Sequence, residues 1–195
     1  MKTAISKSLI ALSVFAAVAA PMAANAESNF TTGAGTPLTA TARVDFSIII
    51  PKFVSLRVGA LGTGNFDLIT FTVPGASVGA GGAGIAGTGG TPGPGAVTAT
   101  VSGNNGQVTL TANATAGGLS NGADVIPFTQ ITTGSSSASL PAPVLVNGPS
   151  APVLVALTGT KITNQTATWT YNFSNSAVVA SGTYAGTVTY TASMP

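Results

Sequence analysis

The sequence predicts an all-β chain that folds as a β-sandwich with Greek-key connections and about nine strands. Three observations support this prediction. Short runs rich in Val, Ile, Thr and aromatic residues alternate apolar with polar positions, as strands with one buried face do. Turn residues separate these runs, for example GNNGQ at 103–107. No segment shows the periodicity of an amphipathic helix.

The first 26 residues have the features of a bacterial secretory signal peptide. Lys2 and Lys7 precede a short apolar run over 9–20, and Ala24-Asn25-Ala26 forms an A-x-A cleavage site. We therefore expect export, a mature chain beginning at Glu27, and a location in the periplasm and then at the cell surface or outside the cell. The apolar run is shorter than the roughly 20 residues of a membrane span, and no later stretch reaches that length.

The charges that remain after cleavage cancel. The mature chain has four cationic side chains (Arg43, Lys52, Arg57 and Lys161) and four carboxylates (Glu27, Asp45, Asp67 and Asp124), so its net charge is zero. A neutral chain has no basic field to hold phosphates, so we expect no nucleic-acid partner. The chain also has no histidine and no cysteine, which excludes histidine-based triads, thiol nucleophiles and most zinc sites. We expect no catalytic, cofactor-binding or metal-binding residues, and we do not expect an enzyme.

The strongest strand pattern lies close to the start of the mature chain. In TARVDFSIIIPKFVSLRV (41–58) and the preceding Ala40, apolar residues occupy the even positions from 40 to 50, and Arg43, Asp45 and Ser47 lie between them. Pro51 removes a backbone donor, after which the same parity resumes at 54, 56 and 58. This predicts two collinear strands with a bend, and it places Arg57 on the outer face.

Seven further strands are expected along the chain, with a hairpin joining the second and third of them across GNNGQ. They cover 66–73, 96–102, 107–113, 128–132, 153–157, 166–173 and 183–192. Trp169, Tyr171 and Phe173 share one parity in TATWTYNF, a stripe that we interpret as core. A carbohydrate platform is the alternative interpretation of that stripe.

The expected organisation is a flexible leader over 27–39 followed by one domain over 40–195. Within the domain, 74–95 is nearly half glycine and is predicted to be a mobile or irregular loop. The Ser- and Pro-rich stretch 133–152 is predicted to be a long surface connection.

The last strand carries a more specific pattern. In SGTYAGTVTYTASMP (181–195), Tyr184, Gly186, Val188 and Tyr190 share one parity, and the other holds four threonines: Thr183, Thr187, Thr189 and Thr191. This G-x-Y-x-G-x-V-x-Y pattern, together with the early strand TATARVDFSIII behind a signal peptide, resembles bacterial chaperone–usher fimbrial subunits (pilins). It also resembles the secreted β-sandwiches of the spore-coat-U and DUF4402-like groups.

The resemblance implies an immunoglobulin-like β-sandwich that lacks one strand. In that family a periplasmic chaperone lends the missing strand until the N-terminal extension of the next subunit replaces it, with an outer-membrane usher as a further partner. By this pattern Val44, Phe46, Ile48 and Ile50 would be the strand-donor residues, and Tyr184, Val188 and Tyr190 would line the closing edge strand. The resemblance thus implies a structural subunit of a surface fibre that binds other copies of itself.

A second hypothesis stays open at this point. Residues 38–50 could complete their own domain, which would then be a self-complete secreted β-sandwich that binds a protein or glycan at the cell surface. The two hypotheses differ in one structural feature: whether the apolar face of 44–50 has a partner within its own chain.

Overall fold

The computed structural model describes residues 29–35, 37–60, 66–82 and 84–195. The predicted signal peptide and Glu27 lie outside the described residues. The chain divides into two units at the bond between Ile50 and Pro51. Residues 29–50 and residues 51–195 are therefore described separately.

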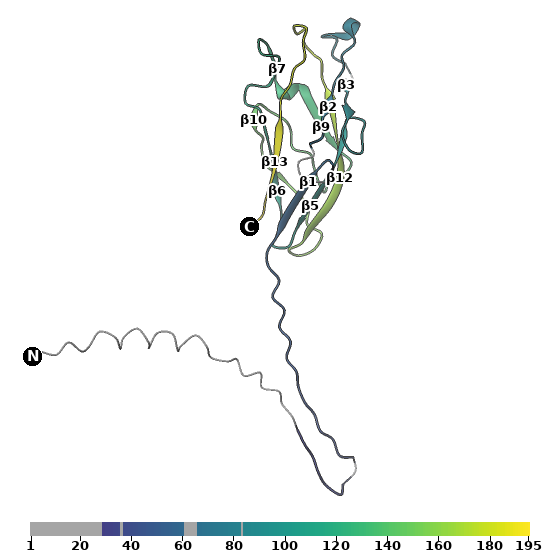
Figure 1. Cartoon of the computed structure of the whole chain (residues 1–195), viewed down its shortest axis with the longest axis vertical. Helices are drawn as coiled ribbons and strands as arrows, with labels where there is room; N and C mark the ends of the chain where they lie inside the picture. Colours follow the sequence, from purple (N-terminus) through teal and green to yellow (C-terminus); the bar gives the residue numbers. More distant parts are fainter. Residues whose placement is uncertain (1–28, 36, 61–65, 83) are drawn as a thin grey trace, which may run out of the picture. The chain divides into compact units, whose positions relative to one another are not determined.

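Residues 51–195 form antiparallel sheets, so the all-β prediction is confirmed (Figure 1). The first sheet contains β1 (Val54–Val58), β3 (Ile85–Ala86), β5 (Ala96–Gly103), β9 (Ile131–Ser135) and β12 (Thr163–Phe173). The second contains β6 (Thr109–Ala114), β10 (Gly148–Pro149), β11 (Val153–Leu154) and β13 (Val188–Ser193). Two small ribbons pair β2 (Ile69–Thr70) with β4 (Thr88–Gly89), and β7 (Leu119–Ser120) with β8 (Val125–Ile126). Apart from two 3-10 turns, η1 (Gly75–Ser77) and η2 (Phe128–Gln130), the described residues contain no helix.

The predicted strand number was too low, because the structure has thirteen strands in the described residues. Seven of them are only two residues long. Strands this short cannot show a period-two pattern, so the sequence pattern does not predict them.

The two larger sheets pack on one shared core. Both contribute side chains with almost no exposed surface, such as Val101 from β5, Leu110 from β6 and Trp169 from β12. Trp169, Tyr171 and Phe173 are all buried, so their interpretation as core is confirmed. Alternation along β5 and β12 sends the intervening threonines to the outer face, where Thr100 lies opposite Thr166.

The hairpin predicted at 103–107 is wrong. The chain does reverse there, but β5 pairs with β1 and β12, and β6 pairs with strands of the other sheet. Because β5 already has a strand on each side, it has no free edge for β6. The turn therefore carries the chain from one sheet to the other.

Several predicted strands are shorter or shifted in the structure. The prediction over 66–73 is reduced to β2, that over 153–157 to β11, and that over 183–192 begins only at Val188. Residues 128–130 form η2, and strand β9 starts after them at Ile131. Pro127 precedes this 3-10 turn, and its fixed φ suits the start of such a turn.

The two loop predictions had different outcomes. Residues 74–95 are irregular as expected, although they contain η1, β3 and β4. The stretch 133–152 is not simply a surface connection, because Leu140, Pro143 and Leu145 are buried in it. Leu140 also accepts a hydrogen bond at its carbonyl oxygen from Trp169 Nε1, at 3.1 Å. This stretch is therefore part of the core.

Asp67 ties together three segments at the end of β1. One carboxylate oxygen accepts hydrogen bonds from the backbone N–H of Ala60 (3.1 Å) and of Thr91 (3.0 Å), and the other accepts from the Thr91 hydroxyl (3.1 Å). Gly59 has φ +85°, and a Cβ there would collide with the Asp67 carboxylate, so glycine is required at that turn.

We expect Asp67→Ala to lower the free energy of unfolding by about 1–3 kcal/mol, because it leaves two backbone N–H groups without their charged acceptor. Chemical denaturation of the mature chain would measure the change. Asp124→Ala is the matched control, since its carboxylate has no hydrogen-bond or ion-pair partner among the described residues. Equal losses for the two variants would contradict the role given to Asp67.

Candidate functional site: an apolar segment and an open sheet edge

The predicted donor residues lie in a segment without secondary structure. No strand is present among the described residues 29–50, and Figure 1 draws 37–50 as plain chain. The strand predicted over 40–50 is therefore absent from the isolated chain, whereas its continuation, β1, is present. A strand is stable only when its backbone groups pair with a neighbour, and 41–50 has no neighbour to pair with among the described residues.

The same segment exposes an unusual amount of apolar surface. Phe46 is 89% exposed, Ile48 84% and Ile49 92%, and Val44 and Ile50 are exposed to a similar degree. Single exposed apolar residues are ordinary, but five within seven residues are a concentration of exposed apolar surface. Large exposed apolar patches are typical of sites at which proteins contact other proteins or membranes.

The predicted closing strand is found at an open edge of the second sheet. β13 pairs with β6 on one side, and no described residue pairs with its other side. Val188 and Tyr190 lie within β13, as predicted for the closing edge strand. Tyr184 does not, because it precedes the strand by four residues and belongs to the loop at the end of the sheets.

β1 is the open edge of the first sheet in the same way. It pairs with β5, and its other side has no partner strand among the described residues. β1 and β13 run beside one another without hydrogen bonds between them. Two unpaired edges, one from each sheet, thus meet on one side of the core.

The core is only half closed along this side. We call it the β1/β13 seam, formed by the inward-facing residues of both strands and by Met194, which follows β13: Leu56, Val58, Val188, Tyr190, Ala192 and Met194. All six contact the core but stay partly exposed, whereas the inward residues of β5 and β6 are fully buried. Val54, of the same parity in β1, is 43% exposed. The seam is therefore a strip of core surface that no strand of the described residues covers.

Tyr190 anchors the seam to the other sheet. Its hydroxyl lies 2.9 Å from that of Tyr171 in β12, and its ring packs on Trp169 with a centroid distance of 5.2 Å. Burial raises the pKa of both tyrosines, so both hydroxyls stay protonated and one can donate to the other. The seam thus packs against aromatic side chains of β12, to which Tyr190 is held by a hydrogen bond and a ring contact.

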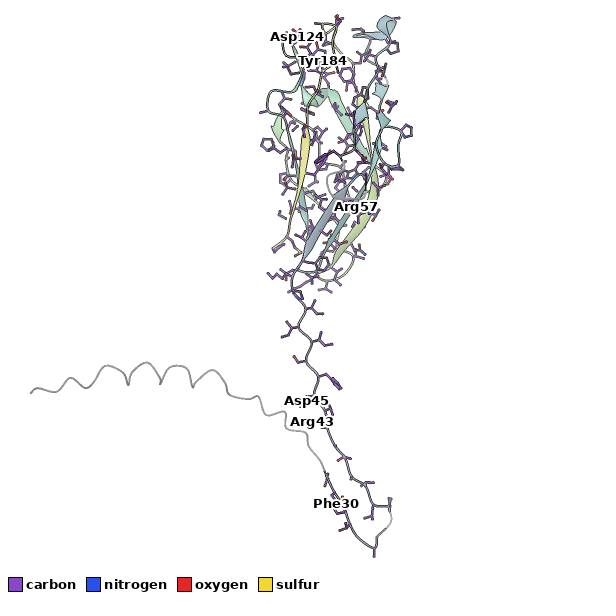
Figure 2. The ribbon with its side chains drawn as sticks, in the orientation of Figure 1. Phe30, Arg43, Asp45, Arg57, Asp124 and Tyr184 are labelled. Atoms are coloured by element: carbon purple, nitrogen blue, oxygen red, sulfur yellow. The ribbon has the colours of Figure 1, made fainter. Side chains whose placement is uncertain are left out.

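A second feature lies at one end of the sheets, where Asp124 and Tyr184 come close together (Figure 2). They border a pocket of about 380 Å³ with Val178 on its wall. The Tyr184 hydroxyl donates a hydrogen bond to the Ala180 carbonyl at 2.9 Å. The pKa of Tyr184 is raised, mainly by desolvation and to a lesser extent by the negative charge of Asp124. Since the hydroxyl is already engaged and Asp124 is the only acid there, this pocket offers no catalytic pair.

The described residues contain no group of three or more metal-ligating side chains placed to hold an ion. Within the same part of the chain, no helix is long and apolar enough to cross a membrane. No family model matches the chain, and neither a curated protein nor a solved structure matches it.

Proposed function

We propose that this protein is a non-enzymatic structural subunit of a bacterial surface fibre, assembled by donation of a β-strand from one copy to the next. In this proposal residues 51–195 are an immunoglobulin-like β-sandwich with Greek-key connections that lacks one strand. The missing strand is residues 41–50 of a neighbouring copy, and it enters the β1/β13 seam.

One observation carries the proposal: the chain has both an exposed apolar segment without a partner and a half-open strip of core without a strand. Val44, Phe46, Ile48 and Ile50 share one parity, so as a strand they would present one continuous apolar face. The free edges of β1 and β13 offer the backbone groups with which such a strand would pair. The two surfaces are alike in chemistry, because both are apolar and both have backbone groups to pair.

The energies are of a suitable size. Burying a Val, Ile or Phe side chain contributes about 1.5–3 kcal/mol, so four of them contribute about 6–12 kcal/mol before the cost of ordering the segment. A whole domain is typically stable by about 5–15 kcal/mol. A donated strand would therefore change the stability of the receiving subunit by an amount comparable with its total.

Donation between copies gives a fibre because the contact is heterologous. Each copy has one donor segment and one seam, so contacts of this kind continue head to tail unless they close into a ring. Before assembly the open edges would be prone to wrong pairing. We therefore include a periplasmic chaperone and an outer-membrane usher among the proposed partners.

The test is assembly of the mature chain in a bacterial periplasm. Residues 27–195, expressed there and run on a denaturing gel without heating, are expected to give a ladder that collapses to monomer on boiling. A variant that lacks residues 27–50 should give monomer in both lanes. If the full mature chain gives one monomer band, and the deletion only unfolds the protein, then residues 41–50 complete their own domain and the proposal is wrong.

A further inference from the structure

Arg57 has an unpaired donor at the open edge of the first sheet. It is the fourth of five residues in β1, between Leu56 and Val58, which face the core, so it lies on the opposite face, where Nη2 donates to the Thr100 hydroxyl at 2.9 Å. Its Nε has lost contact with solvent, yet it has no hydrogen-bond partner among the described residues. Leaving a buried donor unpaired is costly, and the cost is larger for charged groups. Arg57 therefore keeps one guanidinium N–H without an acceptor, in a strand that has no neighbour on one side among the described residues.

Asp45 is the side-chain carboxylate that remains available among the described residues. The oxygens of Asp67 are occupied by Ala60 and Thr91, and Asp124 lies with Tyr184 at the end of the sheets, away from Arg57 (Figure 2). Asp45 contacts only Arg43, at 3.1 Å, with both side chains about three-quarters exposed. An exposed ion pair of this kind contributes little free energy, so breaking it to form another contact with Asp45 costs little.

We infer that Asp45 of one copy pairs with Arg57 of the next copy when the strand is donated, and that this ion pair sets the register. The inference rests on the proposed function. When Val44 and Phe46 face the core, Asp45 faces outward; when Leu56 and Val58 face the core, Arg57 faces outward as well. This agreement of faces holds for either direction of the incoming strand.

The pair discriminates between registers in a way that the apolar face does not. A slip of one residue turns Asp45 into the core, and a slip of two moves it about 6–7 Å along the edge, out of reach of Arg57. The apolar side chains tolerate the two-residue slip better, because Val44, Phe46, Ile48 and Ile50 alternate regularly. In this inference Asp45 determines the register of the donated strand, and Arg57 is the residue with which it pairs.

Charge reversal on each side tests the pair in the full mature chain. Asp45→Arg sets cation against cation in its own fibre, and Arg57→Asp sets carboxylate against carboxylate. After denaturation and refolding, each variant alone is expected to form the ladder about tenfold more slowly than the unaltered chain. An equal mixture of the two should recover the original rate, because each then donates only to the other. Differently tagged subunits should alternate along the resulting fibre.

Thr41→Arg is the matched control, since it adds the same cation to the same face of the segment four residues before Asp45. It should assemble at the original rate. Asp45→Arg lies in the exposed segment outside the sheets, so its comparison with Thr41→Arg stands even if Arg57→Asp folds poorly. Equal rates for Asp45→Arg and Thr41→Arg would overturn the inference, as would a mixture no faster than its components. If the unaltered chain forms no ladder at all, the proposed function itself fails.

Discussion

Trp169→Ala is expected to lower the free energy of unfolding by about 3–5 kcal/mol, which is a large share of the stability of a domain of this size. Trp169 has no exposed surface, and it lies between the two sheets, where its ring packs on Tyr190. The substitution removes the largest core side chain and opens a cavity. It also removes the indole N–H from which the Leu140 carbonyl accepts a hydrogen bond. Chemical denaturation, monitored by circular dichroism, would measure the loss.

Two further variants separate the causes of that loss. Trp169→Phe keeps an aromatic ring against Tyr190 but cannot donate to Leu140, so its loss should be smaller than that of the alanine variant. Thr170→Ala, on the exposed face of the same strand, should stay within about 0.5 kcal/mol of the unaltered chain. A loss for Trp169→Ala as small as that for Thr170→Ala would mean that the sheets do not depend on this contact.

The core stripe was predictable because it depends on a local rule. Trp169, Tyr171 and Phe173 alternate with polar residues, and alternation alone fixes which of them share a face. Leu140 and Leu145 escaped prediction because they lie in a Ser- and Pro-rich stretch with no period. They are buried because the chain crosses the core there, and only the tertiary contact with Trp169 reveals it.

Pairing was far less predictable than alternation. The residues of GNNGQ specify a reversal of the chain, but they do not specify which strand lies next to which. In the same way, the pattern over 40–50 specifies a face without supplying a partner, so the strand does not form in the isolated chain. Sequence reasoning on these elements went wrong where the answer depends on residues far away along the chain.

The candidate site divides along the same line. Period-two patterns located the apolar segment over 44–50 and the strand that holds Val188 and Tyr190, whereas the donor and closing-strand roles come only from the resemblance to pilins. That β1 and β13 lie side by side with free outer edges depends on the order of strands in two sheets, and no local signal encodes that order. The unpaired Arg57 Nε is a matter of atomic contacts, so it could be found only in the structure.

Ile48→Asp is expected to abolish the ladder, although the residue contacts almost nothing in the isolated chain. Ile48 is 84% exposed there, so the free subunit loses no packing when the side chain changes. In the donated strand that we propose, by contrast, its parity would place it in the seam with Val44 and Phe46. An unpaired carboxylate buried there would cost several kcal/mol, and each 1.4 kcal/mol changes an equilibrium about tenfold. We therefore expect at least about a hundredfold less assembled material on an unheated denaturing gel.

Ile49→Asp provides the control one residue away. Ile49 is 92% exposed in the isolated chain, so the two variants make the same chemical change to neighbouring, similarly exposed residues. They differ only in parity: position 49 faces outward when Ile48 faces the seam, and its carboxylate stays in water. Ile49→Asp should therefore assemble nearly as well as the unaltered chain. If both variants assembled equally well, or both failed equally, the segment would not dock as a strand with one buried face. That result would contradict strand donation and would indicate a contact in which both faces of the segment are equally exposed or equally buried.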